Sequence, residues 1–200
     1  EAAIKTARAY HQHEGDTSRF ELITFKNAFH GRTMATISAS NQEKMHHGFS
    51  PLLAGFKYAE FDTLESAKAL MGPHTAGFLV EPIQGEGGVQ PAPAGYLEGI
   101  RALCDATGAL LIVDEVQTGF ARTGRWFGFE HAGVSPDVVT MAKGMGNGMP
   151  IGACWARSEI ARSFSPGDHG STFSGTALAT SAVLAVIEEM ERLEIGRAHV

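Results

Sequence analysis

The stretch ALLIVDEVQ (109–117) is apolar without a break from Ala109 to Val113 and then presents two carboxylates, Asp114 and Glu115. An unbroken apolar run is typical of a strand that is covered on both faces, as the strands of parallel sheets are. The carboxylate pair follows directly and so places polar chemistry at the end of that strand. The stretch therefore predicts a central, buried strand with a functional edge.

Other segments of the chain have the same strand-like character. They are residues 21–25, 76–83, 137–142 and 151–156. Helical patterns separate several of these runs, and strands that alternate with helices are typical of a mainly parallel sheet covered on both faces. The 200 residues therefore predict one α/β domain.

Four helices are expected from the patterns between the strands. The chain opens in a helical pattern, EAAIKTARAYHQHE, and a second helix follows Asp62, whose spacing to Glu65 suits a capping box. A third covers 94–107 and ends at Gly108. The run 177–187 is apolar nearly all round, which predicts a buried helix.

Three ionisable residues fall at or just after the expected strand ends. They are Glu81, Asp114 and Lys143. Ligands of open α/β sheets bind beyond the carboxyl ends of the strands. We therefore expect these side chains to meet at one edge of the sheet, although they are far apart in sequence.

Lys143 lies in the glycine-rich stretch VVTMAKGMGNGMP (138–150). A lysine in such a turn is usually a surface residue. Here it follows a buried strand, and a desolvated lysine amine can act as a nucleophile. Pyridoxal phosphate chemistry needs both a lysine for the Schiff base and a carboxylate, such as Asp114, facing the pyridine nitrogen. Spacing alone leaves the surface and the catalytic interpretation open.

Several other classes of site are disfavoured by missing motifs. The chain has no GxxxxGK[ST] phosphate loop and no GxSxG elbow, and the glycines at 144–148 precede another strand rather than a helix. The histidine pairs His11/His13 and His46/His47 lack ligand spacing, so we expect them to be solvated and no metal to be bound.

The bulk composition is that of a soluble globular protein, with 44% hydrophobic and 19% charged residues and a net charge of −6. No run of Lys or Arg occurs, and no apolar stretch reaches bilayer-spanning length, so neither a nucleic-acid nor a membrane partner is expected. Cys104 and Cys154 both lie in apolar runs, which predicts buried free thiols in a reducing, cytoplasmic environment.

Five motifs together resemble one family in order and spacing. They are NAFHGRT (27–33), VEPIQGEGGV (80–89), LLIVDEVQTGFARTG (110–124), AKGMGNGMPIGA (142–153) and HGSTFSG (169–175). Through them, nearly all of residues 1–193 resembles the class III pyridoxal phosphate aminotransferases. The resemblance implies the large cofactor domain of a fold type I enzyme and a homodimer with shared active sites.

The resemblance also implies a domain organisation. Residues 1–194 would be part of the large domain, the phosphate loop before the first helix and a C-terminal small domain would lie outside the chain, and 195–200 would be a tail foreign to the native sequence. The chain is therefore expected to be a piece of a longer protein, which alone would bind cofactor weakly and be inactive.

Within the family pattern, each motif carries an expected role. Lys143 would form the Schiff base and then move the proton as acid and base. Asp114 would face the pyridine nitrogen, Gln117 the phenolic oxygen, and Phe29 the ring. The cofactor-binding set that the resemblance implies is Phe29, Asp114, Glu115, Val116, Gln117, Lys143 and Thr172, with Thr172 reaching the phosphate in the neighbouring subunit.

The substrate side of the site is expected at three further residues. The resemblance implies that Arg32 binds a substrate carboxylate, that Ser171 lies near substrate, and that Glu86 pairs with an arginine outside the chain to switch between substrates. The nearest branch of the family transfers the δ-amino group of N-acetylornithine to 2-oxoglutarate, by a ping-pong mechanism, in arginine biosynthesis. Ornithine, succinylornithine and 4-aminobutyrate are alternative donors, and an aminomutase, a racemase or a non-enzymatic binding module is a more distant alternative.

Overall fold

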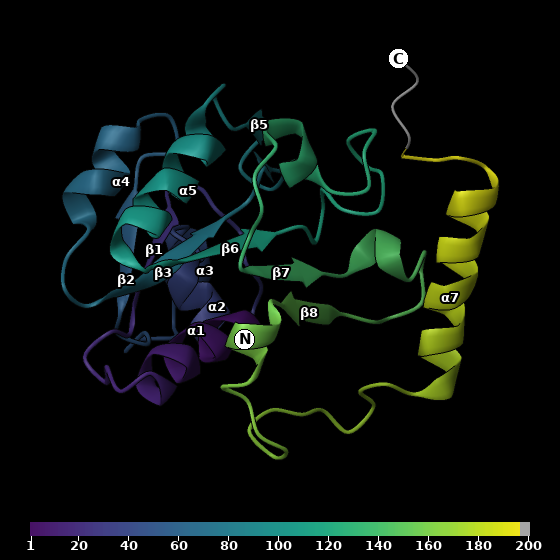
Figure 1. Ribbon diagram of the computed structural model, residues 1–200, viewed down its shortest axis with the longest axis horizontal. Coiled ribbons are helices and arrows are strands. Elements are labelled where there is room, and N and C mark those ends of the chain that lie inside the picture. The colour runs from purple at the N-terminus through teal and green to yellow at the C-terminus, as the bar shows by residue number, and fades with distance from the viewer. Residues whose placement is uncertain (197–200) are drawn as a thin grey trace.

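The computed structural model describes residues 1–196 as a six-stranded sheet with helices on both faces (Figure 1). The strands of this sheet lie in the order β2-β1-β3-β6-β7-β8, and all neighbouring pairs are parallel except β7 with β8. The strand bounds are β1 Glu21–Phe25, β2 Phe56–Ala59, β3 Thr75–Val80, β6 Leu110–Asp114, β7 Val138–Met141 and β8 Ala153–Ala156. A small antiparallel pair, β4 Ile83–Gln84 and β5 Gln90–Pro91, lies outside it. The predicted α/β fold is confirmed.

The helices are short apart from three. Their bounds are α1 Ala2–His13, α2 Met34–Ala39, α3 Glu43–His46, α4 Leu64–Leu70, α5 Tyr96–Thr107, α6 Ser158–Ala161 and α7 Ala177–Arg192, with 3₁₀ turns η1 Gly128–Ala132 and η2 Lys143–Met145. Gly108 ends α5 in the left-handed conformation, with φ 70°, as the sequence predicted. The helix after Asp62 is also confirmed, but Thr63 is its N-cap and makes no side-chain capping bond.

Side chains of the central strands point alternately to the two faces of the sheet, and each face has its own hydrophobic core. On one face, residues such as Phe78, Leu111 and Val113 pack with α4 and α5. On the other, residues such as Leu79, Ile112 and Val138 pack with α1 and α6. Because β6 is buried on both faces, it reads as an unbroken apolar run in the sequence. Because helices cover both faces, the carboxyl ends of the strands (the strand exits) and the residues that follow them have fixed positions.

Two expected strands end earlier than the sequence suggested. The run 76–83 is divided, since β3 ends at Val80 and β4 begins at Ile83. Pro82 lies at the break and has no N–H for a sheet hydrogen bond. The stretch 109–117 likewise forms a strand only as far as Asp114, and Val116 then donates its N–H to the Asp114 side chain instead of to a neighbouring strand.

Helix α7 is not the buried helix that its composition predicted. Leu178 and Leu184 are 71% and 57% exposed, and Ala179 and Met190 are its only buried residues. In Figure 1 the helix lies to one side of the sheet, beyond β7 and β8, and it contacts the η2 turn. The helix is apolar, as its sequence indicates, but most of its surface is not covered by any part of the described chain.

Two further expectations about single residues are corrected. Cys104 is buried as predicted, but Cys154 is exposed because β8 is the edge strand of the sheet. His11 is buried, not solvated, and its Nε2 lies 2.8 Å from the carbonyl oxygen of Ala76. Burial lowers the pKa of His11. Residues 197–200, the greater part of the expected foreign tail, lie outside the described residues.

Candidate functional site

The Asp114 carboxylate joins three strand exits. Its Oδ2 lies 2.8 Å from Nδ1 of His30, in the turn after β1. Its Oδ1 accepts hydrogen bonds from the Thr140 hydroxyl on β7, at 3.0 Å, and from the Val116 N–H, at 3.1 Å. The side chains of His30 and Asp114 are only 2% and 9% exposed. Three groups, each at or near the end of a different strand, therefore hold one carboxylate in a fixed position at the sheet edge.

His30 is a member of this site that the sequence did not single out. Its other ring nitrogen, Nε2, is buried and has no hydrogen-bond partner within residues 1–196. The signal available in the sequence was its place next to Phe29 in a turn that follows a strand. That signal does not reveal the pairing with Asp114, because the two residues are 84 positions apart. Thr140 was missed for the same reason.

Glu81 is buried directly behind the Phe29 turn. One of its carboxyl oxygens accepts the backbone N–H of Phe29 at 3.0 Å. The pKa of Glu81 is raised to about 7, chiefly by burial and also by the negative charge of Asp114, while His30 and the N–H groups of Phe29 and Gly85 oppose this rise. The sequence placed Glu81 at a strand end, and the structure adds the contact that links it to Phe29.

Phe29 and Arg32 lie together at the rim of this cluster. The Phe29 ring is half-buried, and the Arg32 guanidinium carbon lies 5.5 Å from its centroid. A cation within about 6 Å of an aromatic face is attracted to it. Arg32 is itself exposed, so its planar donors remain available to a carboxylate from outside the chain.

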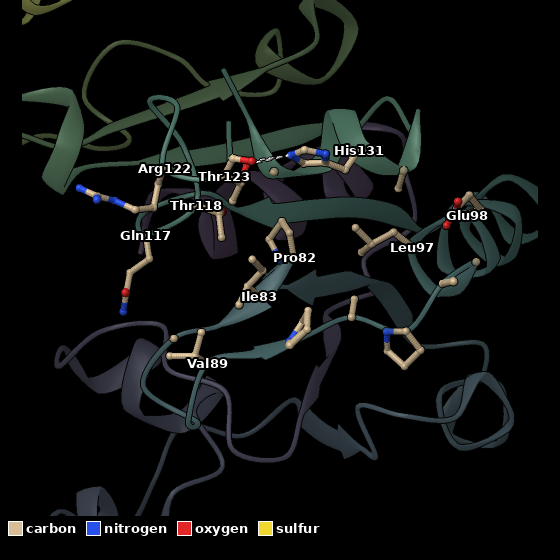
Figure 2. Close-up of a pocket in the computed structure, with 18 residues that line it drawn as sticks. Pro82, Ile83, Val89, Leu97, Glu98, Gln117, Thr118, Arg122, Thr123 and His131 are labelled. Carbon is tan, nitrogen blue, oxygen red and sulfur yellow. Dashed lines mark hydrogen bonds between the residues drawn. The ribbon is translucent and has the colours of Figure 1, made fainter. Parts of the chain in front are cut away.

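Gln117 extends from the β6 exit toward the glycine-rich loop 85–89 (Figure 2). A Cβ placed on Gly85 would lie 2.6 Å from the Gln117 amide, so a larger residue there would displace this side chain. Gln117 also lines a cavity of about 750 Å³ between that loop and the segment 122–132. Neither Asp114 nor Lys143 lines this cavity. The cavity therefore lies beside the polar cluster and does not define it.

Lys143 begins the η2 turn, two residues after β7 ends. Its φ is 45°, in the left-handed region that non-glycine residues seldom adopt. Such strained residues cluster at functional sites. Gly146 closes the turn, and a Cβ there would lie 2.2 Å from the Met149 carbonyl oxygen. Lys143 is exposed in the described chain, so its amine is accessible there, and its catalytic role stays a prediction.

Glu115 points away from this edge. Its carboxylate, fully buried, accepts the Thr118 hydroxyl at 2.5 Å and the N–H groups of Gly128 and Phe129 at 2.9 Å each. Burial raises the pKa of Glu115, and these hydrogen bonds lower it. The side chain thus fixes the 118–129 segment, while Val116 contributes its N–H to Asp114. A cofactor contact by Glu115 or Val116 stays a prediction.

The remaining expected residues are not gathered by side-chain contacts. Glu86, Ser171 and Thr172 are exposed, and their side chains make no hydrogen bond or ion pair in the described part of the chain. Their expected roles stay predictions.

Two general features bear on the class of site. Among residues 1–196, no three His, Cys, Asp or Glu residues are placed to hold a metal ion. Over the same residues, no helix has both the length and the apolarity needed to cross a bilayer. The site offers a fixed carboxylate, a flat aromatic ring and an accessible amine at one edge of the sheet.

Comparison with known proteins gives concordant results. The family described as aminotransferase class-III matches residues 1–198. The acetylornithine aminotransferases of Myxococcus xanthus and Aquifex aeolicus are 51% and 48% identical to the chain, each over 96% of it, and it covers 48% and 51% of those proteins. A solved ornithine aminotransferase from Toxoplasma gondii is 35% identical, with a TM-score of 0.92 over 96% of this chain and 47% of that one. The chain thus spans about half the length of the curated relatives it matches.

Proposed function

Because the chain belongs to the class III aminotransferases, we propose that it carries the central part of a site that binds pyridoxal phosphate and transfers an amino group. The observation that carries this proposal is the buried Asp114 carboxylate, held by His30, Thr140 and Val116 at the edge where Lys143 begins its turn. The Toxoplasma structure has pyridoxal phosphate at partial occupancy in its active site, and the residues of this edge suit that cofactor.

The fit of the site to that cofactor rests on its donor set. A carboxylate fixed by three neighbours suits a protonated ring nitrogen, because a charge-assisted hydrogen bond is strongest when it is already oriented. Phe29 offers a flat face for a ring, and Gln117 an amide at the same edge. When bound, pyridoxal phosphate supplies an electron sink for the carbon that bears the substrate amine.

The chain's own residues would then divide the work as follows. Lys143 Nζ would hold the cofactor covalently and afterwards carry a proton to and from the reacting carbon. Asp114 would keep the ring nitrogen protonated, and His30 would keep Asp114 oriented. Arg32, exposed beside Phe29, would bind the substrate carboxylate.

The proposed amino donor is N-acetylornithine, and the proposed acceptor is 2-oxoglutarate. The relatives named for acetylornithine are about 50% identical to the chain, whereas the ornithine aminotransferase is 35% identical. Glu86 is exposed in the glycine-rich loop, which leaves it free to pair with an arginine outside the chain, as a switch between the two substrates requires. Ornithine, succinylornithine and 4-aminobutyrate remain alternative donors.

The assembly that we propose is a homodimer in the cytoplasm. Ser171 and Thr172 lie in an exposed segment, which suits side chains that reach the substrate and the cofactor phosphate of the neighbouring subunit. We assign residues 1–194 to the large domain of the enzyme. The proposed activity belongs to the whole protein. This chain would contribute the central residues that one subunit supplies to a shared active site.

A panel of amino donors tests this proposal. The intact protein, loaded with pyridoxal phosphate, is given N-acetylornithine, ornithine, succinylornithine or 4-aminobutyrate with 2-oxoglutarate, and glutamate is measured. We expect the highest kcat/KM with N-acetylornithine. A preference for another donor would move the assignment to that sister activity, and turnover without 2-oxoglutarate would favour an aminomutase or racemase.

A further inference from the structure

Glu81 is an ionisable residue in a position that a neutral side chain could fill. It is 6% exposed, and its carboxyl oxygen accepts the N–H of Phe29 at 3.0 Å. A buried carboxyl group costs stability unless it is well paired. Ionisable groups retained in such positions next to a polar cluster are candidates for a functional role.

The loop that begins at Glu81 lies against the turn that carries Phe29. The Gln84 amide donates to the Lys26 carbonyl oxygen at 2.9 Å, and a Cβ on Gly87 would lie 2.9 Å from the carbonyl oxygen of Asn27. These contacts hold the first residues of the turn. Of the described hydrogen bonds between the two segments, the one made by Glu81 reaches the residue that bears the aromatic ring.

We propose that Glu81 is a positioning residue, whose carboxyl group fixes the backbone of Phe29 and thereby the placement of the aromatic ring against the bound cofactor. This inference rests on the proposed function, since it assumes that Phe29 meets a cofactor ring. Glu81 does not touch the reacting atoms. It acts through one hydrogen bond to the residue that covers the ring.

The strength of this hold depends on pH. An ionised carboxylate accepts a hydrogen bond more strongly than a neutral carboxyl group does. The titratable groups that face Glu81 are His30, from the Phe29 turn, and Asp114, at the end of β6. Burial raises the pKa of Glu81 to about 7, so the hold on Phe29 weakens as the pH falls through neutrality.

Two substitutions separate the geometric role from the ionisation. Glu81→Gln keeps an oxygen that can accept the Phe29 N–H but does not titrate, and Glu81→Ala removes the acceptor. Asp137→Ala is the matched control, because Asp137 is an equally buried carboxylate (6% exposed) that accepts the Leu111 N–H before the start of β7, at the other end of the sheet.

The readouts are the dissociation constant of pyridoxal phosphate and the visible circular dichroism of the bound cofactor, in the intact protein from pH 6 to 8. We expect Glu81→Ala to weaken binding about tenfold or more and to reduce the dichroic signal, as loss of a hydrogen bond to a charged group would. Glu81→Gln should bind within about twofold of the wild type and lose the pH-dependent change of the signal near neutrality. Asp137→Ala should lower thermal stability without changing the dichroic signal per bound cofactor.

Wild-type binding and dichroism in Glu81→Ala would overturn the proposal, and so would a Glu81→Gln variant that binds as poorly as the alanine variant. If the alanine variant does not fold, the glutamine variant still decides, since a wild-type pH transition retained in it would overturn the role of Glu81. A wild-type protein that binds no pyridoxal phosphate contradicts the proposed function itself, an outcome distinct from all of these.

Discussion

The edge around Asp114 and the segment 165–176 are both expected to serve one cofactor, yet the chain holds them very differently. Asp114 is 7% exposed and has polar partners from three strand exits. Thr172 is exposed and its neighbour Phe173 is 80% exposed, while the segment is tied back through the Lys5 ammonium and the Asp168 carbonyl oxygen.

The edge around Asp114 is positioned by the sheet of this chain alone. The segment 165–176 is expected to take its functional position only when another part of the assembly packs on it. A doubly covered sheet fixes the positions of residues at its strand exits without help from another chain. A segment with few internal contacts takes its functional position from whatever packs on it. The exposed faces of α7 and of the segment 165–176 are therefore where we expect a second subunit to matter most.

The largest effect on activity is expected from substitution of Lys143, the exposed lysine at the same sheet edge as Asp114. Lys143→Ala should lower transamination by roughly a thousandfold or more, because general acid–base catalysis alone contributes about 10²–10⁴ and the covalent link is lost as well. Initial rates with N-acetylornithine measure this. Lys68→Ala, at an exposed helical lysine, is the control and should retain wild-type rates. Equal losses in both variants would remove Lys143 from the mechanism.

Removal of the Asp114 carboxylate, which contacts groups at three strand ends, should lower the free energy of unfolding as well as the activity. Asp114→Ala leaves His30, Thr140 and the Val116 N–H without their acceptor, and each buried donor left without an acceptor costs about 1–3 kcal/mol. Urea denaturation measures the free energy of unfolding. Asp105→Ala, which removes an exposed carboxylate that pairs with Arg101, should cost less than about 1 kcal/mol. A similarly small loss for Asp114→Ala would show that the edge is not preorganised.

Glu81 sharpens the comparison through its pH dependence. Its pKa rises from an ordinary 4.5 to about 7 on folding, so the folded state keeps a proton that the unfolded chain releases between these values. The contribution of Glu81 to the free energy of unfolding therefore falls as the pH rises from 4.5 to 7, by roughly 3 kcal/mol at most at about 1.4 kcal/mol per pKa unit.

Denaturation of wild type and Glu81→Gln across this pH range measures the effect. The wild-type stability should fall relative to the variant as the pH rises. The lowered pKa of His11 acts in the opposite sense but is common to both proteins, so it cancels in the difference. Parallel stability profiles would contradict the burial-driven shift at Glu81.

The smallest effect on folding is expected in the exposed segment. Thr172→Ala should change the free energy of unfolding by less than about 0.5 kcal/mol, as exposed substitutions generally do. It should nevertheless weaken pyridoxal phosphate binding in the dimer by about tenfold, if the hydroxyl meets a phosphate. The control is Ser174→Ala, two residues away and also exposed. Unchanged cofactor affinity in Thr172→Ala would confine the site to the preorganised edge.

The parts of this molecule that could be predicted from its sequence are those that depend on local pattern. The unbroken apolar run before Asp114 gave a buried strand, and Gly108 ended α5 where its left-handed conformation was expected. The pairing of His30 with Asp114 could not be predicted, because it depends on strand order: β1 and β6 are separated by β3 in the sheet.

The errors have a common physical origin. The apolar helix α7 and the apolar run around Cys154 were expected to be buried, and both lie where the described chain provides no cover. An apolar composition predicts that a surface is buried, but it does not show whether the same chain or another one buries it. Lys143, which its spacing left open as a surface or a catalytic residue, is likewise exposed in the described chain.

The most direct test of the account is the visible absorbance of the intact protein with pyridoxal phosphate, in the wild type and in Lys143→Ala. We predict a bound-cofactor band in the wild type that is lost on addition of N-acetylornithine and returns with 2-oxoglutarate, and no such band in Lys143→Ala. A wild-type protein without the band, or a Lys143→Ala variant that retains it, would contradict the assignment of this sheet edge as the cofactor site.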